Sequence, residues 1–166
     1  GRYWLKAYDF LPVFTRDGKP GISTNIVQVQ ASSSGAAKAS VGLVNSNLFY
    51  FWWILQSDEF HVLSPEVLLA PLPRSALHDK KLTAAVKRLM DDYKRKAILK
   101  KIRVGGHDVR MQEIHARLSL PIIHEIDAIL AKHYHLTSDE LLFLQTYDMK
   151  FRAPKPGGTE QSGTLI

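Results

Sequence analysis

Apolar and polar positions at the start of the chain predict a hairpin. Residues 16–21 (RDGKPG) are dense in turn formers, and Ile22–Gln30 alternates apolar and polar side chains as a half-buried strand does. We therefore expect extended structure over residues 1–30, with its turn inside 16–21.

Residues 36–60 predict two helices in succession. The division falls at Asn45-Ser46-Asn47, where short polar side chains can cap a new helix. The second piece, NLFYFWWILQSDEF, is apolar nearly all round, so we expect it to be buried on most sides or to lie under another protein surface. A short strand at Val67–Leu69 should follow, ended by Pro71 and Pro73.

The longest predicted helix runs from Lys80 to about Lys101. Its apolar positions recur at spacings of four, three, four and four: Leu82, Val86, Leu89, Tyr93 and Ala97. Ile98, Leu99 and Ile102 break this phase. The helix should therefore bend, end or meet another element there.

A second extended segment precedes the last helices. Residues 104–108 form a predicted turn, and residues 109–116 alternate loosely as a strand. A helix then starts at Ser119 or Leu120, with Pro121 tolerated in its first turn. Its predicted inner face consists of Ile122, Ile126, Ile129, Leu130 and His133 or Tyr134.

The segment Thr137-Ser138-Asp139-Glu140 is a capping box. The Thr137 hydroxyl can accept from the amide of Glu140, whose carboxylate can accept from the amide of Thr137. Leu136 and Leu141 stand at the positions of the accompanying hydrophobic staple. The pattern predicts a helix, a tight corner and a second helix.

Together these elements predict an α/β (α+β) fold. It would have a small mixed or antiparallel sheet packed by several helices, including one long basic helix and a C-terminal helix pair. With 166 residues, of which 45% are hydrophobic, one domain is expected. We assign it residues 1–152, as a fragment of a larger chain, followed by a tail at 153–166 that is flexible or held by a neighbour.

The distribution of charge indicates the kind of partner that the chain binds. The formal net charge is +6, which favours a polyanionic partner such as nucleic acid or an acidic membrane surface. Between Asp79 and Arg103 there are ten Lys or Arg and three Asp, so this segment holds the whole excess. Two rows of basic residues lie roughly opposite the apolar stripe of the long helix: Lys80, Lys87, Lys94 and Lys101, and Lys81, Arg88 and Arg95. The alternative is a solvated face with Asp91 and Asp92 as local partners.

Motifs of common catalytic sites are missing from the sequence. There is no glycine-rich nucleotide loop, no paired Cys/His spacing and no Asn/Asp-Pro-Pro-aromatic motif for a flipped base. His133 and His135, with His124 nearby, project in different directions from a helix end. We therefore expect no catalytic residue and no metal in this chain.

The compartment and the aromatic residues are less constrained. The absence of cysteine is compatible with a reducing cytoplasm, and the apolar run Leu48–Leu55 is far short of the roughly 20 residues that cross a bilayer.

The FYFWW cluster at 49–53 favours core packing over base stacking, because consecutive aromatics encircle a helix. Trp4 and Tyr8 are expected to be more exposed.

Two stretches resemble a known family. VNSNLFYFWWILQSDEFHVLSPEVLLAPLP (44–73) resembles a segment of target-recognition domains in which an Asn-Ser/aromatic helix precedes a Pro-Leu-Pro. LPIIHEIDAILAKHYHLTSDELLFLQTYDMKFR (120–152) resembles the C-terminal end of adenine-specific DNA methyltransferases of the bifunctional (type IIG) restriction-modification kind. The matching positions are Ile126-Asp127, Leu130-Ala131, His133-Tyr134, Glu140-Leu141 and Tyr147-Asp148-Met149-Lys150-Phe151-Arg152.

The resemblance implies a TaqI-like C-terminal specificity domain. Its parent would have an upstream methyltransferase domain that uses S-adenosylmethionine, and in some cases a nuclease, while this fragment would hold no cofactor. One position departs from the family pattern, because His135 stands where a glycine is usual. Either His135 accepts a left-handed backbone there, at a cost of roughly 1 kcal/mol, or the corner is built differently.

The sequence-level hypothesis is a module that recognises double-stranded DNA for a catalytic domain outside this chain, in the cytoplasm and without a membrane. Phosphate contacts are assigned to Lys80, Lys81, Lys87, Arg88, Lys94 and Arg95. Candidate base contacts are Arg16, Lys19, Asn25 and Gln28, although Arg16 and Lys19 could equally be turn solubilisers. The alternative is a protein interaction or helical spacer module of a restriction-modification complex, in which Leu82, Leu89 and Tyr93 pack on a partner helix.

Overall fold

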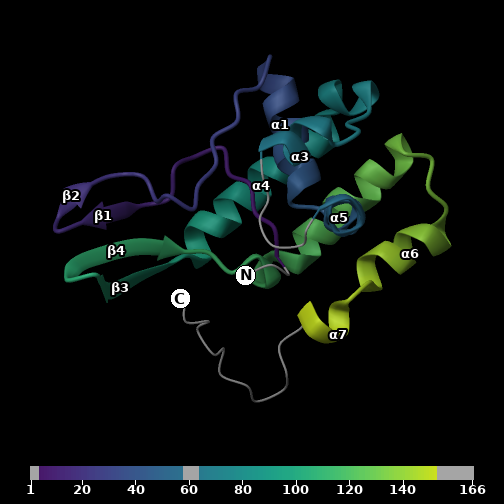
Figure 1. Cartoon of the computed structure of the whole chain (residues 1–166). Helices are drawn as coiled ribbons and strands as arrows, with labels where there is room; N and C mark the ends of the chain where they lie inside the picture. Colours follow the sequence, from purple (N-terminus) through teal and green to yellow (C-terminus); the bar gives the residue numbers. More distant parts are fainter. Residues whose placement is uncertain (1–3, 58–63, 153–166) are drawn as a thin grey trace.

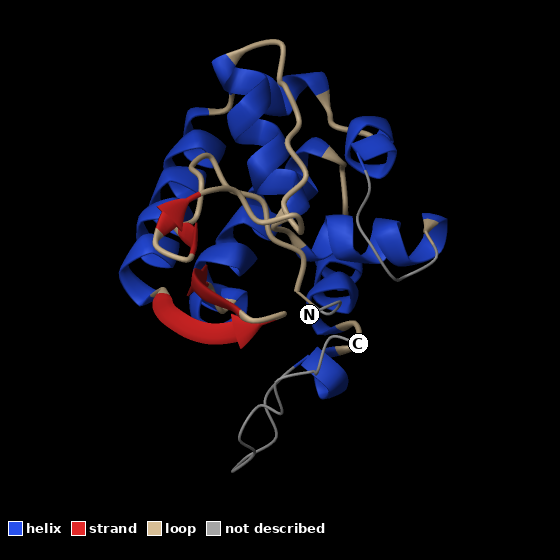
Figure 2. Ribbon diagram, turned by 60° about the vertical axis from the view of Figure 1, so that its left-hand side comes forward, coloured by secondary structure: helices blue, strands red, loops and turns tan. Residues whose placement is uncertain are grey.

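A computed structural model describes residues 4–57 and 64–152 of the chain (Figure 1). The helices form one body, and a four-stranded antiparallel sheet of order β2-β1-β4-β3 lies at its edge (Figure 2). The predicted α+β class with a small antiparallel sheet, a long basic helix and a C-terminal helix pair is confirmed. The predicted tail, 153–166, lies outside the described residues.

The elements follow one another in this order: β1 (Phe14–Arg16), β2 (Lys19–Pro20), α1 (Ser34–Val44), α2 (Asn47–Gln56), α3 (Ser64–Leu69), the 3-10 helix η1 (Arg74–His78), α4 (Lys80–Lys96), β3 (Ile98–Val104), β4 (His107–Glu113), the 3-10 helix η2 (Ala116–Ser119), α5 (Leu120–His133), α6 (Ser138–Thr146) and α7 (Met149–Arg152).

The core lies between α1, α4 and α5. The predicted stripe of α4 faces it, with Leu82, Val86, Leu89 and Tyr93 at 0–1% exposure. Gly42 of α1 permits close packing, because a Cβ atom there would lie 3.0 Å from Val86 Cγ2. Burial of this stripe is what orients α4, and it leaves the opposite face of the helix in solvent.

The apolar α2 begins where its capping signal predicts. The Ser46 hydroxyl accepts from the amide of Phe49, which separates α2 from α1. Phe49, Tyr50 and Trp53 are almost fully buried, so the core interpretation of the aromatic cluster is confirmed for these three residues.

Helix α4 ends at the predicted break in phase. Ala97 is extended, and Ile98 opens β3 instead of a further helical turn. The β3–β4 hairpin turns at Gly105 and Gly106, with φ of 56° and 83°. Positive φ at both central residues is the requirement of a tight two-residue hairpin loop, and glycine meets it without strain.

Two predicted strands are wrong. Ile22–Gln30 is irregular, since the strand that pairs with β1 after the turn consists of Lys19–Pro20 alone and the chain leaves the sheet after it. Val67–Leu69 belongs to helix α3. The Ser-Pro-Glu that opens α3 is a helix-start signature, with proline early in the first turn and an acidic residue beside it.

The C-terminal corner forms as predicted. Thr137 and Glu140 make both hydrogen bonds of the capping box. Ahead of it, the amide of Leu136 donates to Ala131 O (2.9 Å) and that of His135 to Lys132 O (3.3 Å), which is a Schellman ending of α5. His135 has φ of 57°, so the expected left-handed position is confirmed. On the inner face of α5, Ile126 and Leu130 are fully buried as predicted, joined by Ile123.

Replacing His135 by Gly is expected to raise the free energy of unfolding by roughly 1 kcal/mol, since glycine adopts positive φ without the Cβ penalty. His135→Ala is the control, because it removes the imidazole and keeps the Cβ, and it should give no gain. Urea denaturation followed by circular dichroism measures both. Equal stabilisation by the two variants would contradict backbone strain at this position.

Candidate nucleic-acid interface

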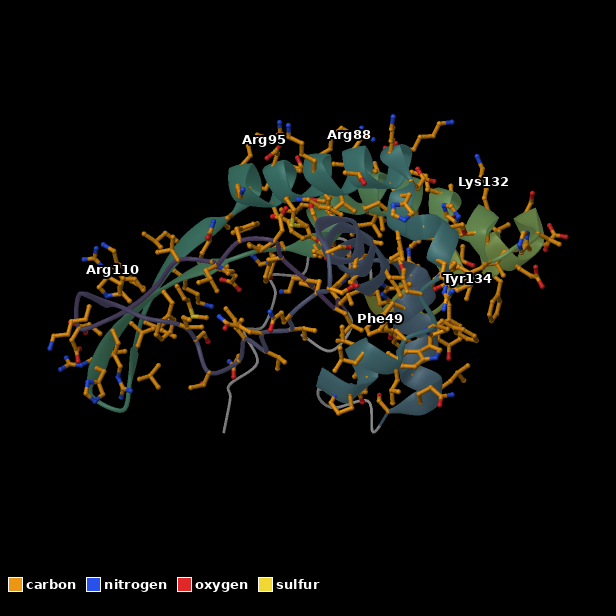
Figure 3. The ribbon with its side chains drawn as sticks, turned by 90° about the horizontal axis from the view of Figure 1, so that it is seen from above. Phe49, Arg88, Arg95, Arg110, Lys132 and Tyr134 are labelled. Carbon is orange, nitrogen blue, oxygen red and sulfur yellow. The ribbon has the colours of Figure 1, made fainter. Side chains whose placement is uncertain are left out.

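The outer face of α4 is a row of exposed cations. All six predicted phosphate-contact residues are exposed: Lys80, Lys81, Lys87, Arg88, Lys94 and Arg95. Figure 3 shows Arg88 and Arg95 directed away from the body along one edge of the molecule, with Lys132 of α5 on the same edge. The face also includes one exposed acid, Asp91. The helix therefore presents a strongly positive surface to solvent.

Part of this charge is already engaged within the chain. Arg88 pairs with Glu125 of α5, Arg95 with Asp92, and the Lys94 ammonium lies 4.6 Å from the centre of the Phe10 ring. In the described ranges 4–57 and 64–152, Lys80, Lys81 and Lys87 have no ion pair. Arg88–Glu125 is an exposed pair, and such pairs contribute about 0–1 kcal/mol, so a polyanion can replace it at little cost.

Asp92 lies on the inner side of α4 and anchors its C-terminal end. It accepts from Ser119 Oγ and from Lys96 Nζ, both at 2.6 Å. Burial alone would raise the pKa of Asp92, but the hydrogen bonds from Lys96, Ser119 and Arg95 outweigh it and hold the pKa below its usual value. Asp92 thus stays ionised, binds Lys96 and Ser119, and partly offsets the charge of Arg95 on the outer face.

The four strands form a wing that projects from the helical body beyond the C-terminal end of α4 (Figure 1). Its two hairpin tips are tied together by Asp17, which has φ of 50°. The Asp17 carboxylate accepts from the Asp108 amide (2.9 Å) and lies 2.6 Å from His107 Nδ1. These bonds, the one to His107 first, lower the pKa of Asp17. We call these strands and their turns, residues 14–20 and 98–113, the wing.

The predicted base-contact residues are exposed but do not form one cluster. Arg16 and Lys19 lie opposite each other on β1 and β2, and Arg16 also pairs with Val109 of β4. They therefore share one face of the wing with Val109. Asn25 and Gln28 lie in the irregular segment that follows β2.

The sequence-level hypothesis overlooked the other face of the wing. Lys101 and Arg110 are directly opposite each other, and Arg103 lies two residues along β3 on the same side. The signal was available in the alternation of Lys101 and Arg103 with Ile102. The break in helical phase at Ile98, Leu99 and Ile102 indicates only that the helix bends, ends or meets another element, so it does not predict which side chains share a strand face.

Trp4 and Tyr8 are packed rather than exposed for recognition, which corrects the expectation. Tyr8 lies 6.1 Å from the ring of Tyr93, and burial raises its pKa to about 12. Trp4 donates from Nε1 to Arg152 O (3.1 Å), and its ring centre lies 4.4 Å from the Arg152 guanidinium. Both side chains join the N-terminal segment to the helical body.

Asn47, Asp127 and Arg152 meet in a buried polar junction. Asp127 accepts from the Asn47 amide (2.8 Å) and from Asn47 Nδ2 (2.7 Å), while Asn47 Oδ1 accepts from Arg152 (2.7 Å). Arg152 also lies 4.0 Å from the centre of the Tyr50 ring. Burial raises the pKa of Asp127 to about 6 despite the hydrogen bonds from Asn47. The junction ties α2, α5 and α7 together, and its three side chains are almost fully buried.

An apolar hollow of about 240 Å³ lies beside α2 and the end of α5, with Phe49 and Tyr134 on its wall (Figure 3). The Tyr134 hydroxyl is already used, since it donates to Pro71 O at 2.6 Å. The other lining residues are apolar. The hollow therefore lacks the convergent polar groups that orient a reacting ligand.

The histidines considered for a metal are separated. His133 lies between Asp79 (2.8 Å) and Ser75 (2.9 Å), which fixes its ring at the base of α4. Burial lowers the pKa of His124, with the nearby Arg152 charge acting in the same direction. Within the part of the chain that the structure describes, no three His, Asp or Glu side chains are grouped to hold a metal ion.

Across the described residues, no helix combines the length and the apolar character needed to cross a bilayer. No family model, curated protein or solved structure matches the chain, so its function is inferred from its own surface and chemistry.

Proposed function

We propose that this chain is a double-stranded DNA recognition module of a restriction-modification adenine-N6 methyltransferase, acting in the cytoplasm. It would position DNA for an upstream catalytic domain of the same parent chain. That domain, and not this one, would use S-adenosylmethionine. The observation that supports the DNA-binding part is the exposed face of α4, where six cations lie on one side of a helix whose other side is core.

The dimensions of this face suit a duplex. Seventeen helical residues span about 25 Å at 1.5 Å per residue. Duplex DNA has one phosphate charge per about 1.7 Å of its axis, so a helix of this length passes many phosphates. The cations on α4 can therefore fix the register of the protein on DNA, whereas sequence must be read by other residues.

The motif resemblance supports the methyltransferase part of the proposal. Asn47, Asp127 and Arg152 come from the two resembling stretches, and they form one hydrogen-bonded unit. A shared structural junction accounts for why these residue types would recur together in such domains.

The interaction-module alternative loses its original basis. The stripe of Leu82, Leu89 and Tyr93 was the surface offered to a partner helix, and it is buried in this chain's own core. Exposed apolar residues do occur on α6 and α7, namely Leu142, Phe143 and Phe151. They favour contact with another part of the parent over a role for α4 as a spacer.

Fluorescence anisotropy with a labelled 40-base-pair duplex of random sequence tests the DNA-binding proposal. We expect a dissociation constant of roughly 1–100 µM near physiological salt, and a log–log salt slope of about −5 for six phosphate contacts. Vesicles of phosphatidylserine serve as the competing polyanion. Absence of duplex binding, or tighter binding to the vesicles, would reject DNA as the partner.

A further inference from the structure

Two cations face each other across the centre of the wing. Lys101 and Arg110 are Cα partners in the β3–β4 pairing, so their side chains emerge side by side. Both are exposed, and neither makes an ion pair with any residue in 4–57 or 64–152. Like charges directly opposite in a sheet are destabilising. An electron-rich group of a bound molecule that lies over both side chains would offset this repulsion.

The alternation along β3 and β4 separates a more exposed face from a more buried one. Leu99, Lys101, Arg103, Asp108 and Arg110 share the exposed side, whereas Ile102, Val109 and Met111 are more buried on the other. Asp108 is the acid on the exposed side, 4.0 Å from Arg103 Nε. Arg103 is therefore partly balanced, and Lys101 and Arg110 are the cations without a balancing acid.

The wing is a preorganised element. The Gly105-Gly106 turn closes β3–β4, and Asp17 binds the amide of Asp108 while its own amide donates to Asp108 O (2.8 Å). Each hairpin tip thus holds the other. A rigid element loses little conformational entropy on binding, so its side chains can discriminate between partners.

The wing also continues the cationic face of α4. Only Ala97 separates α4 from β3, and in Figure 3 Arg110 lies beyond the end of α4 that carries Arg95. A duplex whose backbone lies along α4 would therefore meet the exposed face of the wing next. The seven residues of β3 span about 23 Å. Because β3 is an outer strand of the sheet, the sheet can approach a B-DNA major groove, about 12 Å wide, with its β3–β4 edge first.

From this geometry we infer that the β3–β4 hairpin enters the major groove and that Arg110, with Lys101 beside it, reads base edges there. The inference rests on the proposed DNA-binding function. An arginine fork can donate to O6 and N7 of one guanine, and the adjacent lysine can donate to a neighbouring acceptor. Arg16 and Lys19 point from the other face of the wing, so they are not the primary readers.

The test is a selection from random 40-base-pair duplexes with the whole chain, followed by anisotropy on the selected duplex and on the unselected pool. Arg110→Lys retains the charge but loses the fork. We expect binding to the pool to be unchanged and binding to the selected duplex to weaken by roughly 5- to 150-fold. Arg16→Lys, the same change on the opposite face, should leave both values unchanged. Circular dichroism establishes that both variants are folded.

An RNA duplex of the same length is the second control. Its major groove is too narrow and deep for side chains to read, although it offers the same phosphates. Arg110→Lys should therefore not change RNA binding. Failure of the wild-type chain to bind the random pool would reject the proposed function itself. Pool binding without a selected sequence, an effect of Arg16→Lys but not of Arg110→Lys, or equal effects on DNA and RNA would leave the function standing and overturn the role of the hairpin.

Discussion

Replacing Asp127 by Ala is expected to lower the free energy of unfolding by about 3–5 kcal/mol. The substitution leaves the Asn47 amide and Nδ2 without their acceptors and removes an anion that favours the Arg152 charge, in a site where Asp127 itself is 0% exposed. A typical domain is stable by only 5–15 kcal/mol. The variant should therefore unfold at much lower urea concentration or fail to fold.

Glu125→Ala is the matched control for this prediction. Glu125 is an acidic residue on the same helix, but its partner Arg88 is on the surface, with both side chains about half exposed. Its loss should cost less than about 1 kcal/mol. Similar midpoints for the two variants in urea denaturation would show that the buried junction contributes no more than a surface pair.

The pH dependence of stability gives an independent readout of the same junction. The folded-state pKa of Asp127 is raised to about 6, above its unfolded value of about 3.9. The folded state thus binds the proton more tightly, so this group's contribution to stability decreases as pH rises from about 4 to 6. In Asp127→Asn this contribution is absent. The stability difference between wild type and Asp127→Asn should therefore shift in favour of wild type on acidification, and a pH-independent difference would contradict the raised pKa.

Features set by a few neighbouring residues could be predicted from the sequence. The Thr137–Glu140 capping box, the left-handed His135 and the Ser46 helix start all depend on side chains within one turn of their backbone partners. The stripe of α4 was also predictable, because a helix of this length repeats its period several times. These local signals fixed where the cationic face of α4 would lie.

Features set by distant pairing could not be predicted. Residues 22–30 do not continue β2, and β1 takes its second partner from β4, about ninety residues away, which no local signal indicates. The faces of the wing depend on the same register, since a shift of one residue would exchange Arg110 with Val109. The junction of Asn47, Asp127 and Arg152 likewise joins residues about a hundred positions apart. Nothing in the sequence shows that these three residues contact one another.

The largest expected effect on binding comes from removing four cations of α4 together: Lys87, Arg88, Lys94 and Arg95 to Ala. Each lost phosphate contact makes the slope of log binding constant against log salt concentration shallower by about 0.9. Loss of four contacts therefore makes this slope shallower by about 3.6. The same counterion term predicts an affinity loss on the order of 10³-fold near 0.1 M salt. Because all four side chains are exposed and lie opposite the buried stripe, the thermal stability of the variant should change little.

The control keeps the charge of the same four positions and changes the cation type: Lys87→Arg, Arg88→Lys, Lys94→Arg and Arg95→Lys. If α4 contacts the backbone as a row of charges, this variant retains the wild-type slope, because counterion release depends on the number of phosphates neutralised. Among the single variants, Lys87→Ala should weaken DNA binding more than Arg95→Ala, because Asp92 already partly offsets the charge of Arg95. An unchanged slope in the fourfold Ala variant would remove α4 from the DNA interface. The wing would then have to bind the duplex without it, and the continuity between helix and hairpin would have no role in recognition.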